Sequence, residues 1–375
     1  MRDATGLESI PSPSLLFYPE RIEANLARML DIVDGHPERL RPHVKTHKCR
    51  EILELQLGQG IARAKCATLA EMELALSAGL PDVLLAYQPV GPNIERLLAL
   101  RARFPDSVLS AVVDDESVLQ TIAAAVSSAG QDPLRLLLDL DTGMHRTGIA
   151  PCDDALALVA EMVSLPAIEF GGVHAYDGHV HEPGLDERND AFTESLRTLQ
   201  DFLDRMVGNG FPEPRVVAGG SPTFALHAQV SASSATPWEC SPGTTFLWDA
   251  GYGQNFPDLG FEPAAGLLTR VISKPGDRRL CVDLGHKAVS AENPIERRVR
   301  FPALPDGRFL SQSEEHLVLE SPQAADFSVG DTLIGIPWHI CPTVALHDHA
   351  HLFRNGSTTG ETWKIAARHR RLSGE

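Results

Sequence analysis

The sequence predicts an α/β fold, a (β/α)8 (TIM) barrel followed by a mostly β domain. Between about residues 40 and 245, short apolar or β-branched runs alternate with stretches of helical periodicity. Such alternation indicates a parallel sheet, and eight strand–helix units favour closure into a barrel. An open doubly wound sheet is the alternative. After about residue 255, β-type runs separated by Pro, Gly and Asp turns replace this pattern.

The expected barrel strands are short and rich in Val, Ile and Leu. Between them, apolar residues recur three and four positions apart, as at Phe192, Leu196 and Leu199, which is typical of amphipathic helices. The eight strands are expected at Leu40–Val44, Ile61–Thr68, Asp82–Tyr87, Val108–Asp114, Leu134–Asp141, Phe170–Asp177, Arg215–Ser221 and Trp238–Thr245.

The second domain is expected to consist mainly of strands. An early run, Ser14–Phe17, precedes the first barrel strand and can pair with this β domain. We expect a barrel domain over residues 14–250, and a β domain over residues 251–375 together with residues 1–13. Strands of the β domain are expected at Leu267–Ile272, Leu280–Leu284, His316–Leu319 and Thr332–Ile336.

The composition is that of an ordinary globular enzyme. Of 375 residues, 43% are hydrophobic and 22% are charged, which excludes a disordered chain and a fibrous repeat. The net charge of −17 repels phosphate backbones and anionic lipids, so no nucleic acid or membrane partner is expected. No targeting segment and no apolar run of about 20 residues is visible, so we expect a cytoplasmic protein. The six cysteines lack CxxC spacing and are expected to be free thiols.

A lysine stands at the end of the first expected strand, in the run Arg-Pro-His-Val-Lys-Thr-His-Lys of residues 41–48. In (β/α)8 barrels the reactive residues lie at the C-terminal ends of the strands. Loss of water at a closed barrel mouth favours the neutral amine of Lys45, which can then form a Schiff base. Taken alone, a lysine in so basic a run is more often a solvated surface charge.

The fifth expected strand runs into the turn Asp-Leu-Asp-Thr-Gly-Met-His-Arg-Thr-Gly, residues 139–148. Two glycines flank Arg146 and let the backbone turn tightly. The guanidinium is then held in a position suited to a phenolate or carboxylate oxygen. The same run fits equally well an ordinary βα turn held by an Asp–Arg pair.

The seventh and eighth expected strands end in small and hydroxyl-bearing residues, with Gly220 and Ser221 after the seventh and Gly243 and Thr244 after the eighth. In barrels, the loops at these two places often bind phosphate through backbone N–H groups. Gly, Ser and Pro stretches are usually plain turns, so the prediction of a phosphate site depends on their location after the seventh and eighth strands. A strand-end lysine, an arginine for a ring oxygen and two phosphate loops together suit pyridoxal 5′-phosphate.

Three motifs resemble those of one known family. They are Arg-Pro-His-x-Lys-Thr at 41–46, Asp-Thr-Gly with Arg and Gly at 141–148, and Asp-Leu-Gly-His-Lys at 283–287. Over almost its whole length the sequence is similar to the D-threonine aldolase and D-serine dehydratase family, which are alanine-racemase-type, fold-type III enzymes. The resemblance implies that Lys45 carries the cofactor and Arg146 faces its ring hydroxyl. It also implies that the remaining cofactor-binding residues are Tyr176, Gly220, Ser221, Gly243 and Thr244, the last four near the phosphate.

The family also implies a divalent metal beside the cofactor, bound by a histidine and a second ligand two residues on. Here the stretch reads Pro-Trp-His-Ile-Cys-Pro-Thr, and alternation along an extended segment puts His339 and Cys341 on one face. The aldolases tend to have Asp at the second position and the dehydratases Cys, whereas the continuation at 342–348 looks more like the aldolase branch. A thiolate with imidazole suits Zn²⁺, and a carboxylate would better suit Mn²⁺ or Mg²⁺.

A histidine cluster follows the sixth expected strand, in the run His-Ala-Tyr-Asp-Gly-His-Val-His-Glu of residues 174–182. A neutral imidazole there can take the proton from a substrate β-hydroxyl, directly or through metal-bound water. Where the aldolases carry a functional histidine this sequence has Glu182, so His179 and His181 are the two candidates for the base. Either is equally well an exposed loop histidine. A further cluster at 347–351 is expected to be structural or exposed.

Two reactions fit these residues. In the first, a base removes the β-hydroxyl proton and the Cα–Cβ bond breaks, giving glycine and an aldehyde. In the second, Lys45 takes the Cα proton and hydroxide leaves, giving a 2-oxo acid and ammonia, and a metal would assist either route. We expect the first, aldol cleavage of D-3-hydroxy amino acids such as D-threonine. The alternative is dehydration of D-serine or D-threo-3-hydroxyaspartate.

Other classes have less support. A non-catalytic pyridoxal-phosphate-binding regulator would be shorter and would lack the β domain. An amino-acid racemase would need acid–base groups on both faces of the cofactor and no metal. No Walker A, HExxH or GxSxG motif is present. Enzymes of this architecture commonly complete each active site with the neighbouring subunit, so the resemblance implies a homodimer.

Overall fold

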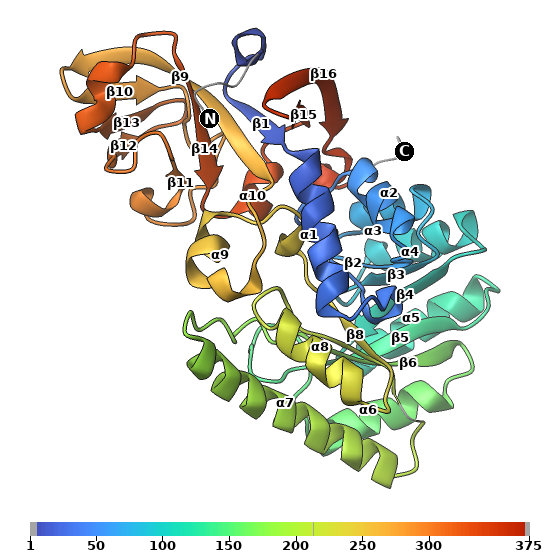
Figure 1. Ribbon diagram of the computed structural model, residues 1–375. Coiled ribbons are helices and arrows are strands. Elements are labelled where there is room, and N and C mark those ends of the chain that lie inside the picture. The colour runs from blue at the N-terminus through green and yellow to red at the C-terminus, as the bar shows by residue number, and fades with distance from the viewer. Residues whose placement is uncertain (1–5, 213, 372–375) are drawn as a thin grey trace. The chain divides into compact units, whose positions relative to one another are not determined.

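The computed structural model describes residues 6–212 and 214–371, which form two compact units (Figure 1). The barrel unit takes in residues 29–45 and 53–243. The sheet unit takes in residues 46–52 and 244–368, together with the residues up to 28. The chain therefore passes between the units several times. Two of these passages occur within helices, α1 (Pro19–Ile32) and α2 (Arg50–Gly58).

Seven parallel strands form the wall of the barrel unit in the order of the chain. Each overlaps one of the expected barrel strands, so the predicted parallel sheet is confirmed. Their bounds are β2 (Arg63–Cys66), β3 (Asp82–Leu85), β4 (Val108–Val113), β5 (Leu134–Leu140), β6 (Ile168–Ala175), β7 (Val216–Ala218) and β8 (Trp238–Cys240).

The stretch predicted as the first strand closes the ring. Leu40 bridges to Cys240 of β8, and His43 bridges to Lys65 of β2, both in parallel orientation. The backbone N–H of Lys65 donates to the carbonyl of Pro42 at 2.8 Å. Because Pro42 has no N–H of its own, this stretch forms single bridges instead of a regular ladder. The predicted barrel is thus confirmed, with a bridging segment in the place of its first strand.

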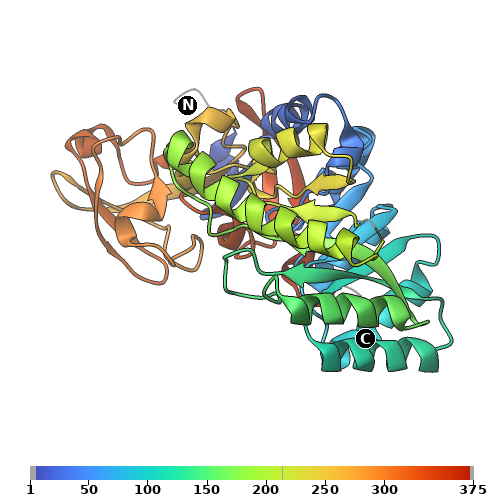
Figure 2. The ribbon, with the colours of Figure 1, turned by 90° about the horizontal axis from the view of Figure 1, so that it is seen from below.

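Six helices follow strands β2 to β7 and cover the outside of the barrel (Figure 1). Side-chain caps start two of them: Thr68 accepts from the N–H of Glu71, and Asp115 from that of Val118. The longest, with 24 residues, crosses Figure 2 as a green ribbon. None of the described helices combines the length and the apolar character that a membrane span needs. Their bounds are α3 (Leu69–Ser77), α4 (Pro92–Arg103), α5 (Glu116–Ser128), α6 (Asp153–Ser164), α7 (Leu185–Gly208) and α8 (Phe224–Ser233).

The interior of the barrel changes character along its axis. Paired positions on neighbouring strands point to the same face, so strand register shows which side chains lie inside. A buried apolar cluster of Leu84, Val112, Leu137 and Val217 fills part of it. This apolar layer separates charged groups at the N-terminal ends of the strands from the polar residues at their C-terminal ends.

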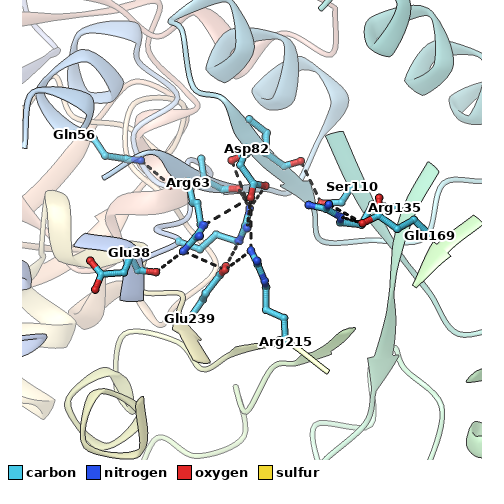
Figure 3. A network of polar contacts seen from close by, with 12 residues as sticks. Glu38, Gln56, Arg63, Asp82, Ser110, Arg135, Glu169, Arg215 and Glu239 are labelled. Atoms are coloured by element: carbon cyan, nitrogen blue, oxygen red, sulfur yellow. Dashed lines mark hydrogen bonds and ion pairs between the residues drawn. The ribbon is translucent and has the colours of Figure 1, made fainter. Parts of the chain in front are cut away.

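Charged residues close the N-terminal end of the barrel (Figure 3). Buried Arg41 donates to Glu239 at 2.5 Å and to both carboxylate oxygens of Asp82 at 2.8 and 3.0 Å. Arg215 and Arg63 reach the other oxygen of Glu239 at 2.8 and 3.3 Å. Burial raises the pKa of the Asp82 carboxyl, but Arg41 outweighs it and holds that pKa below its usual value. The charges are mutually satisfied, so this end of the barrel is a structural plug.

The sheet unit contains one sheet of nine strands in its described residues. Strand β1 (Ser14–Phe17) lies inside this sheet, antiparallel to β9 and parallel to β15, which confirms its predicted pairing with the β domain. The other strands are β9 (Ala265–Gly276), β10 (Arg279–Val282), β11 (Val299–Arg300), β12 (Arg308–Gln312), β13 (Leu317–Glu320), β14 (Thr332–Pro337), β15 (His349–Arg354) and β16 (Ser357–Lys364), and the short helices are α9 (Ala250–Asn255) and α10 (Ile340–Val344).

A small apolar core holds the N-terminal segment against this sheet. Its members come from the first residues of the described chain and from β9, β14 and β15: Leu7, Ile10, Leu16, Tyr18, Leu268, Ile334 and Phe353. All six cysteines of the protein are free, as expected.

Candidate active site

Tyr176, just beyond β6, is the centre of a cluster of cationic side chains at the C-terminal ends of the barrel strands. The Nζ atom of Lys45 lies 5.6 Å from the centroid of its ring, and the Cζ atom of Arg146 lies 4.9 Å from it. Both distances are within the range of cation–π attraction. The structure therefore brings together three residues that the sequence predicts for cofactor binding.

Two glycines provide the space that the Tyr176 ring occupies. A Cβ atom at Gly178 would stand 2.3 Å from the ring, and one at Gly220 would stand 3.1 Å from it. Any side chain at the first position would displace the ring. The predicted phosphate residue Gly220 thus adjoins the aromatic ring, on the loop that follows β7.

Two buried acid–histidine pairs stand at the ends of β5 and β6. Asp139 bonds Nδ1 of His174 at 2.7 Å, and Asp177 bonds Nε2 of His227 at 2.9 Å. Burial raises the pKa of both carboxyls, but their histidine partners outweigh it and hold both pKa values below the usual range. Burial also lowers the pKa of His174. His174 is therefore a neutral imidazole that donates from Nδ1 to a carboxylate.

Hydroxyl groups connect the loops that follow β7 and β8. Thr223 Oγ1 donates to Asp177 at 3.1 Å and accepts from the N–H of Gly220 at 3.3 Å. Ser221 Oγ accepts from the N–H of Gly243 at 3.2 Å. Three of the four residues predicted to lie near a phosphate are therefore neighbours in space.

The turn after β5 is held by Asp141. Its carboxylate accepts from the N–H of Gly143 at 2.9 Å and of His145 at 3.0 Å, and it bonds the His145 ring at 2.8 Å. The Asp–Arg pair that the sequence also allowed is not formed. The partner of Asp141 is His145, so the Arg146 guanidinium is left to face Tyr176.

The two candidate base histidines differ in their surroundings. A Cβ atom at Gly143 would stand 2.8 Å from Nε2 of His179, so this imidazole lies against the turn after β5. Its Nδ1 is buried and has no hydrogen-bond partner in the described chain. His181 is exposed, and its Nδ1 bonds the carbonyl of His179 at 2.6 Å. The geometry favours His179 over His181 as the base.

The expected metal-ligand pair lies in the sheet unit. Its local geometry differs from the prediction, because α10 begins at Ile340 and Cys341 stands in its first turn instead of on an extended segment. The two side chains nevertheless share a hydrogen bond, and Nδ1 of His339 also bonds the carboxylate of Glu292. Burial lowers the pKa of His339, but Cys341 and Glu292 outweigh it and raise that pKa to about 9.

Two hydroxyls lie near the Cys341 sulfur. Thr46 Oγ1 lies 3.1 Å from it and Thr244 Oγ1 lies 3.7 Å from it. Thr244, which the sequence assigns to the phosphate site, therefore contacts the thiol in the sheet unit. No group of three or more metal-ligating side chains occurs among residues 6–212 and 214–371. The ligands of a metal here would be two protein groups, with further positions open to water or substrate.

The residues at the C-terminal end of the barrel fit pyridoxal phosphate. Lys45 and Arg146 have no carboxylate at ion-pair distance within the described chain. Two buried polar atoms nearby in the sequence, Thr142 Oγ1 and His179 Nδ1, also lack a partner there. An anionic ligand with ring and phosphate oxygens would satisfy unpaired cations and donors of this kind.

Sequence reasoning missed three further residues. Lys65 stands inside the predicted strand Ile61–Thr68, between the small residues Ala64 and Cys66. His174 was noted only as the first member of the histidine cluster. Glu292 is 47 positions from His339, its partner. For Lys65 one signal was available: a lysine predicted to lie in a buried strand. Burying a charged side chain costs free energy, so such a lysine indicates a functional or paired group.

Family models match most of the chain. The model of the alanine racemase N-terminal domain matches residues 19–237, and a putative serine dehydratase domain matches residues 264–353. D-threonine aldolase from Arthrobacter sp is 31% identical over 368 residues, 96% of this chain and 94% of the relative. D-threo-3-hydroxyaspartate dehydratase from Delftia sp. (strain HT23) is 26% identical over 380 residues, 96% of this chain and 98% of the relative.

Solved structures agree with this fold. D-threonine aldolase from Filomicrobium marinum has a TM-score of 0.88 at 27% identity, over 96% of both chains. A mutant D-threo-3-hydroxyaspartate dehydratase in its metal-free form has a TM-score of 0.81 at 24% identity, over 96% of this chain and 98% of that chain. The chain belongs to the alanine-racemase-type family of D-threonine aldolases and D-serine dehydratases, and it is a pyridoxal-phosphate-dependent lyase.

Proposed function

We propose that the protein cleaves the Cα–Cβ bond of D-3-hydroxy amino acids, so that D-threonine gives glycine and acetaldehyde. The observation that carries the proposal is the convergence of Lys45 and Arg146 on Tyr176 in a chain 31% identical to a D-threonine aldolase. Dehydration to a 2-oxo acid and ammonia is the second candidate. Cys341 favours it, because the dehydratases of the family tend to carry cysteine at that position.

Residues of the barrel unit bind and orient the cofactor in this proposal. Lys45 holds it covalently, Arg146 pairs with its ring hydroxyl, and the loops around Ser221 and Gly243 receive its phosphate. Asp139 fixes the tautomer of His174, so that Nε2 is an acceptor. When bound, pyridoxal phosphate supplies an electron sink for the charge that develops at Cα.

His179 is the proposed base. Its imidazole takes the proton of the β-hydroxyl as the Cα–Cβ bond breaks, which releases the aldehyde. Exposed His181, already bonded to the carbonyl of His179, is the weaker candidate. The glycine left behind then gains a proton at Cα, for which the Lys45 amine is the proposed donor.

His339 and Cys341 would hold a divalent metal, which would supply Lewis acidity toward a substrate hydroxyl. Imidazole and thiolate together suit Zn²⁺. A dehydratase relative has been described in a metal-free form as a mutant, which supports a metal in this family. A homodimer, as the resemblance implies, is part of the proposal.

Product analysis tests the reaction. Purified protein is incubated with D-threonine, pyridoxal phosphate and Mn²⁺ or Zn²⁺, with L-threonine as the control substrate. We expect glycine and acetaldehyde in equal amounts, and none of either from the Lys45→Ala variant, which should also hold no covalent cofactor. Oxobutanoate and ammonia would instead establish the dehydratase. Covalent cofactor retained in Lys45→Ala would overturn the assignment of Lys45.

A further inference from the structure

A buried threonine of the barrel unit connects the loop after β7 to one of the acid–histidine pairs. Thr223 is fully buried, and its hydroxyl lies between the Asp177 carboxylate and the backbone of Gly220. A hydroxyl has one hydrogen to donate and lone pairs with which to accept. This one donates to Asp177 at 3.1 Å and accepts from the N–H of Gly220 at 3.3 Å. The place of the carboxylate therefore fixes the place of the loop backbone.

The hydroxyl of Thr223 does not have the partner that its place in the chain would suggest. Thr223 is the residue before α8, where a threonine usually accepts from an N–H of the first helical turn. Within the described chain its side chain makes no bond of that kind. The hydroxyl bonds to Asp177 and Gly220 instead, which are outside the helix, so its contribution is to the loop and not to the start of α8.

The acid–histidine pair behind Thr223 has little freedom to move. Asp177 bonds Nε2 of His227 at 2.9 Å, and both residues are only 3% exposed. The His227 ring stacks on Trp238 and meets Phe192 edge to face, with 5.8 and 4.9 Å between ring centroids. A Cβ atom at Gly219 would stand 2.3 Å from this ring, so the imidazole also lies against the loop after β7. Packing on these sides holds the carboxylate in one place.

We propose that Thr223 is a positioning residue for the cofactor phosphate: anchored on Asp177, its hydroxyl fixes the turn at Gly220 and Ser221 that receives this group. The inference rests on the proposed function, in which the loops around Ser221 and Gly243 bind the phosphate. Ser221 Oγ accepts from the N–H of Gly243 at 3.2 Å, so a shift of the first loop would also disturb the second. Binding groups that are already in place lose less conformational freedom when the ligand arrives.

Thr223 can be changed without altering the charges of the barrel interior, unlike its two partners. The Asp177 charge opposes the fall in pKa that burial causes at Lys65, whose Nζ atom lies 5.6 Å from the Tyr176 ring centroid. Loss of the His227 side chain would leave a buried carboxylate without its partner. Thr223→Val nearly keeps the shape of the side chain and removes the hydroxyl, and Thr223→Ser keeps the hydroxyl.

The test compares pyridoxal phosphate with pyridoxal, which has no phosphate group. Each is incubated below saturation with the full-length protein and sodium cyanoborohydride, and the initial rate of Lys45 modification is followed by peptide mass spectrometry. The amine displaces the aldehyde oxygen as water, and hydride reduces the resulting C=N bond, so no substrate is needed. The ratio of the two rates measures the contribution of the phosphate. Thr223→Val should lower this ratio by about 3- to 10-fold, as expected for one lost hydrogen bond, and Thr223→Ser should retain most of it.

A matched control removes an equivalent bond elsewhere. Thr269, in the sheet unit, is also fully buried and donates to Asp283 at 2.6 Å, so Thr269→Val should leave the ratio unchanged. A ratio in Thr223→Val equal to that of the unsubstituted protein overturns the proposal, even if both rates fall, because a general structural defect lowers both alike. An equal loss of the ratio in Thr223→Ser or Thr269→Val overturns it too. Failure of both aldehydes to modify Lys45 in the unsubstituted protein would instead contradict the proposed function.

Discussion

Glu292 determines how the imidazole of His339 is presented. Its carboxylate bonds Nδ1, so Nε2 is the nitrogen that would bind the proposed metal. A carboxylate behind a ligating histidine fixes the orientation of the ring and raises its basicity as a ligand. Glu292 is itself about half exposed, so it can lose its side chain without leaving a cavity.

Glu292→Ala should weaken metal binding by about 10- to 100-fold while the fold is kept. The reason is that the imidazole loses its orienting partner and must be ordered by the metal alone. A competition titration of Zn²⁺ against a chromophoric chelator measures the affinity. Glu296→Ala removes an exposed carboxylate four positions away and should leave it unchanged. Equal affinities in the two variants would show that Glu292 has no part in the site.

For individual residues, the sequence predicts site residues that belong to recognisable motifs. It misses residues whose role depends on a contact with a residue far away in the sequence. Lys45 and Arg146 are predicted because strand ends of a barrel meet at one edge, and Tyr176 is predicted through the family resemblance. Lys65 and Glu292 are not, because their roles depend on which distant residue each faces. No local pattern carries that information. Strand register shows the partners of Lys65, but Glu292 lies in a loop between β10 and β11.

The element that most influences the site is β6. Its register with β5 slips, so that Leu136 pairs with Phe170 but Leu138 pairs with Val173, which inserts one extra residue into β6. Gly172, with φ of 115°, stands in this bulge. Without the extra residue, every later side chain would turn to the other face of the sheet. The bulge therefore aims His174 into the barrel.

Gly172→Ala should lower the free energy of unfolding by more than about 2 kcal/mol. The added Cβ would meet the carbonyl oxygen of Arg215 at 2.0 Å, and the left-handed backbone is strained for alanine. Urea unfolding followed by circular dichroism measures the change. Gly208→Ala, at the end of α7 with nothing within 4 Å, is the control and should be neutral or stabilising. A loss no larger than that of the control would contradict this account of the bulge.

Strand positions were predicted well because short, nearly continuous apolar runs mark the buried strands of a parallel sheet directly. The bulge was not, although two adjacent glycines in Phe170–Asp177 were its visible signal. Likewise, the α10 helix turn that carries Cys341 replaced a predicted extended segment, because Pro342 is acceptable in the first turn of a helix. A bulge or a one-turn helix depends on tertiary contacts, which the periodicity of apolar residues in the sequence does not reveal.

For the whole molecule, the sheet unit is discontinuous in sequence. It draws on the residues up to 28, on residues 46–52 and on residues 244–368. Local patterns predict a β domain of residues 251–375 with residues 1–13 and allow Ser14–Phe17 to pair with it, but they do not mark residues 46–52. The partners of β1 are more than two hundred positions away along the chain. Strand pairing over such separations is chosen by the assembled sheet and not by neighbours in sequence.

Residues 244–375 expressed alone should therefore not fold. Such a fragment lacks β1, which is hydrogen-bonded on both sides, and so leaves β9 and β15 as open edges that invite aggregation. It also loses Leu7, Ile10, Leu16 and Tyr18 from the apolar core of the sheet. We expect no cooperative transition on urea unfolding, whereas co-expression with a segment covering residues 1–56 should restore one. A cooperative transition in the isolated fragment would show that β1 is dispensable and that the C-terminal strands fold independently.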